Sequence, residues 1–193
     1  MNISTKIVPS PKFSDKALND MFDYRLGRLR KSMLEQNISL SILVNPVSLR
    51  YAIDFDEYQL FQSHIPTCYL FVPAHGPLVM HGATRHTFPN VFEYRRPHFI
   101  TPFDSGFDLS NSVKLLSNDV DNFVREYGHN KNIAIERVSS LISNSLQTLG
   151  YQISDAECLV EKAKVIKCDT EIKCIKHSID VAEYGLKLMQ ENT

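Results

Sequence analysis

Side chains that could do chemistry are spread along this sequence without the spacing of a known metal site. The seven histidines and four cysteines include no Cys-x-x-Cys pair. Cys68 is followed by His75, His81 and His86, at intervals that match no closed zinc motif. We therefore expect these imidazoles to face solvent or to make local hydrogen bonds, and Cys68 to be a small core residue of a strand.

Motifs for nucleophilic catalysis and phosphate binding are also missing from the sequence. There is no Gly-x-Ser-x-Gly elbow, and the seven glycines form neither Gly-x-Gly-x-x-Gly nor a Walker pattern. The net charge is −1, so we expect a basic group on the first predicted helix to be a solvated surface: Arg25, Arg28, Arg30 and Lys31. We expect no nucleic-acid partner, and no membrane partner because no apolar run has the length of a span. The scattered cysteines favour free thiols in a reducing cytoplasm.

The loop predicted from Asp54 to Pro66 is the best candidate for a binding surface. It combines acidic side chains with Tyr58, Phe61 and His64. An aromatic wall excludes water, and a histidine can pair with a carboxylate. The alternative is that Phe61 fills the core and His64 is an ordinary surface residue.

Hydrophobic periodicity predicts six helices that would position these side chains. The first covers about 14–36, with Ser14 as its cap, and its buried face follows helical spacing: Leu18, Phe22, Leu26, Leu29 and Met33. The others are expected at 47–53, 109–127, 139–149, 155–166 and from Asp169 onward.

Short apolar segments predict strands between the helices, at 40–44, 67–72, 78–81, 99–101, 132–135 and 151–154. The second and third flank a Pro/Gly turn and indicate a β-hairpin. Residues 82–98 carry Pro, Arg and His and are predicted to be a surface loop. Strands interleaved with helices predict a three-layer α/β fold, in which a mixed sheet of five to six strands has helices on both faces.

The last predicted helix carries an apolar stripe whose members are three or four residues apart: Ile172, Ile175, Ile179, Ala182, Leu186 and Met189. Such a stripe needs a partner surface. We expect the helix to dock on its own domain, on a second chain, or on a further part of a longer protein.

Three segments together carry a family resemblance. A helix with a Gly-Arg step at 24–30 (Y-R-L-G-R-L-R) leads to a strand and a short helix at 42–52 (I-L-V-N-P-V-S-L-R-Y-A), and 165–176 reads V-I-K-C-D-T-E-I-K-C-I-K. In order and spacing these resemble the N-terminal domain of the creatinase, prolidase and aminopeptidase P family of pita-bread metallopeptidases. The stretch 66–82 is similar to the central hairpin of that family, in the branch that includes dimethylsulfoniopropionate lyases. Asp54-Phe55 departs from the usual Thr-Gly step of the family.

The resemblance implies a creatinase/prolidase N-terminal α/β domain with a ribonuclease H-like motif. Its parts would be an irregular arm at 1–13, the α/β domain at 14–166, and at 167–193 a linker helix that starts a catalytic domain. The two metal ions of the family (Mn, Zn, Co or Fe) are held by two Asp, one His and two Glu of that catalytic domain. We expect no catalytic residue, metal or other cofactor in this chain. Asp169 and Asp180 have the spacing of the first two ligands, but on one helix they lie about 16 Å apart and cannot share an ion.

By the same resemblance, the chain is a non-catalytic domain that gates substrate and supports dimerisation in a metal-dependent hydrolase of the Xaa-Pro peptidase or creatinase type. Its expected partners are its own C-terminal catalytic domain and a second copy of itself. Tyr58, Phe61 and His64 would meet substrate at the active site of the partner subunit. The alternative is a stand-alone ligand- or protein-binding α/β module that lacks the catalytic half, and the reading frame after Thr193 would distinguish the two.

Overall fold

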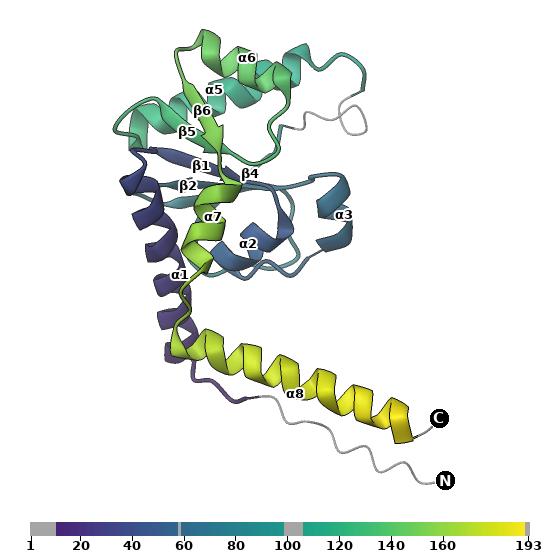
Figure 1. Cartoon of the computed structure of the whole chain (residues 1–193). Coiled ribbons are helices and arrows are strands. Elements are labelled where there is room, and N and C mark those ends of the chain that lie inside the picture. The colour runs from purple at the N-terminus through teal and green to yellow at the C-terminus, as the bar shows by residue number, and fades with distance from the viewer. Residues whose placement is uncertain (1–10, 58, 99–105, 192–193) are drawn as a thin grey trace.

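The apolar segments of the sequence form one mixed sheet in the computed structural model, which describes residues 11–57, 59–98 and 106–191 (Figure 1). The strand order is β4-β3-β2-β1-β5-β6. The strands are β1 (Leu40–Leu43), β2 (Tyr69–Pro73), β3 (Leu78–His81), β4 (Val91–Arg95), β5 (Asn132–Ile135) and β6 (Gln152–Asp155).

Strand direction determines which ends meet at each edge of the sheet. β1 is parallel to β5, and β5 is parallel to β6. β2 runs antiparallel to both β1 and β3, while β3 and β4 are parallel. The carboxyl ends of β1 and β5 therefore lie beside the first residue of β2, at the edge where the candidate site is found.

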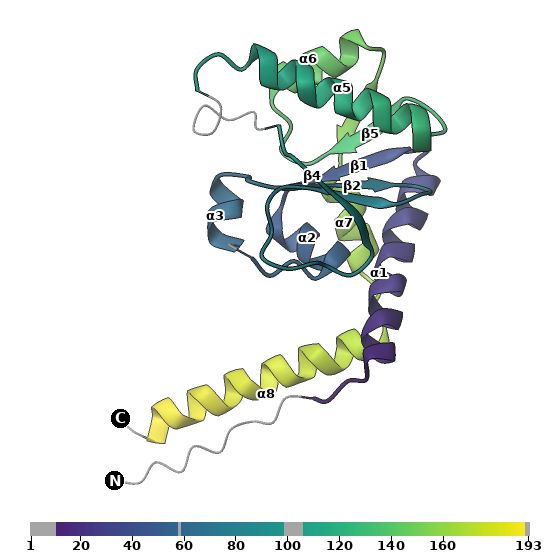
Figure 2. The same ribbon diagram turned by 180° about the vertical axis from the view of Figure 1, so that it is seen from behind.

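Helices cover both faces of the sheet, so that there are three layers (Figures 1 and 2). One face is covered by α1 (Asp15–Glu35), α2 (Pro46–Ile53) and α7 (Glu157–Lys164), and the other by α5 (Ser110–Tyr127) and α6 (Ser140–Thr148). Side chains alternate between the faces along each strand. In β1, Leu43 packs in the core under α1, whereas Leu40 and Ile42 pack in the core under α5.

Local signals fix where the helices begin and end. The Ser14 hydroxyl accepts a hydrogen bond from the Ala17 amide and caps α1, and the Ser139 hydroxyl does the same for α6. Asn45 caps α2, whose first residue is a proline, and α2 ends at Asp54 in the left-handed conformation (φ 57°).

Helix α8 (Asp169–Glu191) extends away from the layered domain, starting next to the N-terminal part of α1 (Figure 1). Its first turn is tied to α1 by an ion pair of 2.9 Å between Arg25 Nε and Glu171 Oε1. The apolar side chains of the predicted stripe are exposed along the helix: Ile172, Ile175, Ile179, Leu186 and Met189. This face of α8 is therefore exposed to solvent in the described structure.

Most of the predicted elements are confirmed, and two predictions are wrong. Residues 82–98 are not only a surface loop, because Val91–Arg95 forms β4 on the outer side of β3. The segment Asp54–Pro66 is not only a loop, because it contains the short helix α3 (Gln59–His64). The strand predicted at 99–101 and the arm up to residue 10 lie outside the described residues. Within the described ranges, none of the helices is both long and apolar enough to span a membrane.

Candidate functional site

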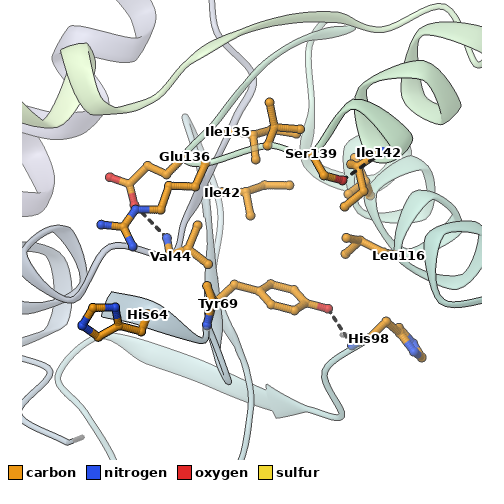
Figure 3. A pocket seen from close by; sticks show the side chains of 14 residues that line it. Ile42, Val44, His64, Tyr69, His98, Leu116, Ile135, Glu136, Ser139 and Ile142 are labelled. Carbon is orange, nitrogen blue, oxygen red and sulfur yellow. Dashed lines mark hydrogen bonds between the residues drawn. The ribbon is translucent and has the colours of Figure 1, made fainter. Parts of the chain in front are cut away.

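A pocket of about 270 Å³ opens at the edge of the sheet where β1 and β5 end and β2 begins (Figure 3). Its floor is the sheet, through Ile42 and Ile135, and its wall is formed by α5 and α6, through Leu116 and Ile142. Polar side chains stand around this apolar interior: His64, Tyr69, His98, Glu136, Arg137 and Ser139. The position matches the usual place for ligands in α/β folds, the crevice beyond the carboxyl ends of the strands.

Glu136 follows the last residue of β5 and connects the two parallel strands at this edge. Its Oε2 accepts hydrogen bonds from the amides of Val44 and Asn45, both at 2.7 Å, so the carboxylate caps the start of α2 (Figure 3). The residue is 1% exposed, and burial raises the pKa of its carboxyl group, against the lowering effect of Ser48 and of the two amides. Its Oε1 has no hydrogen bond of good geometry within the described residues. Glu136 therefore holds the pocket in shape and exposes almost none of its own surface.

Tyr69 starts β2 and carries its hydroxyl into the pocket (Figure 3). The hydroxyl oxygen accepts a hydrogen bond of 3.0 Å from the His98 amide, and His98 Nε2 lies 3.1 Å from a carboxylate oxygen of Asp119. Burial raises the pKa of Tyr69 well above its ordinary value, so the phenol stays protonated and can donate.

His81 lies beside Tyr69 in the core, with the two rings stacked at 4.6 Å between centroids. Burial, together with the nearby charges of Arg95 and His98, lowers the pKa of His81 to about 3. The ring is therefore neutral at physiological pH, and it serves as an aromatic core residue. This corrects the expectation that His81 faces solvent or is hydrogen-bonded locally, because its two nitrogens have no hydrogen-bond partner among the described residues.

The connection from β5 to α6 supplies the charged side of the pocket. Arg137 is held in the left-handed region (φ 50°), which is uncommon for a residue other than glycine. Its guanidinium donates a hydrogen bond to the carbonyl of Ser63 at the end of α3. Two residues later, Ser139 caps α6, so the N-terminal end of that helix also borders the pocket.

The residues predicted as substrate contacts meet different outcomes. Tyr58 lies outside the described residues. Phe61 is on α3 and is 44% exposed, so the alternative in which it fills the core is wrong. His64 ends the same helix, is exposed, and lines the pocket at the opposite end from His98 (Figure 3). Whether Phe61 and His64 contact a substrate stays a prediction.

Sequence reasoning missed the other polar residues of the pocket. Glu136 had one usable signal, a glutamate placed directly after an apolar strand. Arg137, Ser139, Tyr69 and His98 had none, because they come together only through the order of the strands.

A second polar group lies away from the pocket and links the start of the 54–66 segment to the loop before β4. His86 Nε2 is 3.2 Å from Asp56 Oδ1, and its Nδ1 is 3.4 Å from Glu57 Oε1. The buried Glu57 also accepts a hydrogen bond of 2.6 Å from the Arg85 amide. These contacts join two loops and are typical of a structural latch.

No three His, Cys, Asp or Glu side chains of residues 11–57, 59–98 and 106–191 are grouped so that they could hold a metal ion. Cys68 is buried in the core under α1, and His86 is paired with carboxylates. Asp169 and Asp180 both lie on α8, at its start and near its middle. The dinuclear metal centre that the family resemblance implies does not fit the described residues of this chain.

The chain is similar to known proteins over part of their length. No protein-family model matches the sequence. It is 26% identical over 179 residues to dimethylsulfoniopropionate lyase DddP of Roseovarius nubinhibens, which covers 90% of this chain and 40% of that protein. It is 27% identical over 174 residues to the DddP of Roseobacter denitrificans, with 87% and 39% covered. The chain thus spans about 40% of the length of the curated relatives it matches.

Solved structures decide the fold. An Xaa-Pro dipeptidase from Bacillus anthracis superposes with a TM-score of 0.60 at 16% identity, over 89% of this chain and 44% of that one. An Xaa-Pro aminopeptidase structure from Streptococcus thermophilus superposes with a TM-score of 0.51 at 15% identity, over 75% of this chain and 98% of that one. This chain has the fold of a creatinase/prolidase N-terminal domain.

Proposed function

We propose that this chain is the non-catalytic N-terminal domain of a metal-dependent enzyme of the creatinase and prolidase type, in which it shapes substrate access and supports dimerisation. The observation that carries the proposal is partial coverage. The sequence matches 40% and 39% of two dimethylsulfoniopropionate lyases, and the structure matches 44% of an Xaa-Pro dipeptidase. The rest of each of those chains is the natural place for the catalytic machinery, with its two metal ions (Mn, Zn, Co or Fe).

The geometry of α8 supports this proposal. The helix is attached to the domain through its first turn and presents an exposed apolar stripe along the remainder. Burying such a stripe stabilises a helix by roughly 1.5–3 kcal/mol for each large side chain. A catalytic domain that follows residues 167–191 is the partner surface we propose for it.

The gating role rests on α3. Phe61 is 44% exposed and Leu60 is 77% exposed on this short helix, and His64 stands at its end. An exposed aromatic and apolar surface next to an imidazole is suited to meet a small substrate or the neighbouring subunit. Four free cysteines accord with a reducing cytoplasm, which is where we propose the protein acts.

The test compares the 193-residue chain with the polypeptide of its complete reading frame. Both are assayed with Gly-Pro, Ala-Pro and dimethylsulfoniopropionate, with Mn²⁺, Zn²⁺, Co²⁺ or Fe²⁺ supplied in turn. We expect turnover only from the longer polypeptide, abolished by a chelator. Chelator-sensitive turnover by a homogeneous preparation of residues 1–193 would falsify the proposal.

A stand-alone binding module is the second candidate, and the pocket at the edge of the sheet favours it. A site of about 270 Å³ with convergent polar groups does not need a catalytic half to bind a ligand. If the reading frame adds no Asp, Asp, His, Glu and Glu at the spacing of the family, this second function replaces the first.

A further inference from the structure

The pocket between β1, β5, α5 and α6 has an apolar interior and a positive side, and this combination defines a ligand class. We propose that it binds a small monocarboxylate with a branched or aromatic apolar body. This inference concerns the described residues of the chain alone and does not rest on the proposed function.

The size of the pocket limits the ligand. An engineered apolar cavity of 150 Å³ holds one benzene molecule. A volume of about 270 Å³ therefore accepts a body of about ten to twelve non-hydrogen atoms. The interior is apolar on the sheet side, through Ile42 and Ile135, and on the helix side, through Leu116, Val120 and Ile142, so that body is a hydrocarbon.

Two sources of positive charge border this interior. Arg137 carries a permanent charge, and its backbone is held at φ 50°, a conformation that residues other than glycine adopt at a cost. The N-terminal end of α6 begins at Ser140, three residues along the chain, and adds the partial positive charge of a helix start. Together they favour a carboxylate over a neutral or cationic head group.

The negative charge of Glu136 does not oppose this assignment. Its Oε2 already accepts two backbone hydrogen bonds of 2.7 Å at the start of α2, where the helix dipole offsets the charge. The residue is 1% exposed, so the carboxylate presents almost no surface to a ligand in the pocket.

Tyr69 supplies a further donor among the residues that line the pocket. Its oxygen is held by the His98 amide at 3.0 Å, and its own proton remains available for an oxygen of the ligand. Because burial keeps the phenol protonated, this donor persists across the physiological range.

The test uses 3-phenylpropanoate with the 193-residue chain, measured by titration calorimetry and by ¹H–¹⁵N chemical-shift mapping. A ligand of this size gives an expected Kd of roughly 0.1–1 mM, with shifts at the amides of residues 135–142. We expect 3-phenylpropan-1-ol and 3-phenylpropylammonium to bind about tenfold more weakly, because each loses the charge-assisted hydrogen bond. This comparison needs no variant and is independent of any folding defect.

Three variants locate the site. Val138→Phe adds bulk among the lining residues and should abolish binding, and Arg137→Gln should weaken binding about tenfold. Arg50→Gln removes another exposed arginine, on α2, that does not line the pocket, and it leaves the Kd unchanged. No shift at 10 mM acid with folded protein overturns the proposal. Equal binding of the acid and the alcohol, or an equal loss in Arg50→Gln and Arg137→Gln, also overturns it.

Discussion

The attachment of α8 to the domain depends on Glu171, and removing its carboxylate tests that dependence. One oxygen pairs with Arg25 Nε at 2.9 Å, and the other accepts a hydrogen bond of 2.9 Å from the Cys168 amide. The arginine is held in place from a second side, because its guanidinium lies 5.6 Å from the centre of the Tyr51 ring. Glu171 thus both caps α8 and fixes that helix against α1.

The expected magnitude follows from burial. The two side chains are 15% and 7% exposed, which places the pair between surface ion pairs and fully buried ones. Surface pairs contribute up to about 1 kcal/mol, and breaking a buried pair costs about 3–5 kcal/mol. We take about 2 kcal/mol for the pair and about 1 kcal/mol for the lost cap. Glu171→Ala should therefore destabilise the docking of α8 by about 3 kcal/mol, and Glu171→Gln, which can still cap, by about 2 kcal/mol.

Hydrogen exchange followed by mass spectrometry reads this change locally. Amides of 172–185 should exchange about a hundredfold faster in Glu171→Ala, whereas those of β1 and β5 keep their protection. Glu183→Ala removes an exposed glutamate from the same helix and is the matched control, with an expected change within 0.5 kcal/mol. A double-mutant cycle with Arg25→Gln should give a coupling energy of about 1–2 kcal/mol. Equal exchange in Glu171→Ala and wild type would refute the assigned role.

Three further predictions concern the sheet and its edge. Glu136→Ala leaves two amides at the start of α2 without an acceptor and should lower the unfolding free energy by about 2–3 kcal/mol in urea titrations; a loss under 0.5 kcal/mol contradicts this. The pKa of His81 is about 3 in the folded protein and about 6.5 in the unfolded chain. The neutral ring therefore contributes its full stability to the folded protein above pH 6.5, and this contribution is lost as the pH falls toward 3. In denaturant titrations, the unfolding free energy of the wild type should fall by up to about 1.4 kcal/mol per pH unit between pH 6 and 4, and this fall should be smaller in His81→Phe. The same pH dependence in the wild type and the variant would contradict the assignment. Gly82→Ala puts a methyl group 2.4 Å from the Cys68 side chain at φ 147° and should cost about 2–4 kcal/mol. Gly27 lies in the middle of α1 with open space around it, so Gly27→Ala should instead stabilise the folded protein by about 0.5–1 kcal/mol and raise its Tm. Similar Tm shifts in Gly82→Ala and Gly27→Ala would refute this reasoning.

The parts of the fold that could be predicted are those with strong local patterns. The apolar positions of α1 repeat at helical spacing around Leu26, Leu29 and Met33, and all three are buried as predicted. Leu40–Leu43 and Tyr69–Pro73 read as apolar strands because both are buried throughout. In α1 and in these two strands, the residues within a short segment are enough to indicate the secondary structure.

The missed elements lack such patterns for a physical reason. Val91–Arg95 lies at the outer side of the sheet and is only half-buried, with Phe92 77% exposed, so its sequence resembles a polar loop. Helix α3 has six residues, too few for a period to show. Pro66 shortly after it strengthened the impression of a loop.

The pocket could not be predicted because distance along the chain separates its parts. Glu136 caps a helix that starts 90 residues earlier in the sequence. That contact exists only because β1 and β5 are neighbours and parallel, and a single sequence does not state which strands pair. His64 was selected for its residue type, and the strand order brings it to the pocket.

The length of α8 turns the anchor at its first turn into a lever. At 1.5 Å per residue, the part of α8 beyond Glu171 extends about 30 Å from the ion pair at the first turn. A tilt of about 10° at that pivot would carry the far end sideways by about 5 Å. The orientation of anything joined to that far end therefore depends on the Glu171 carboxylate. Small shifts near Glu171 would become large movements of the attached body.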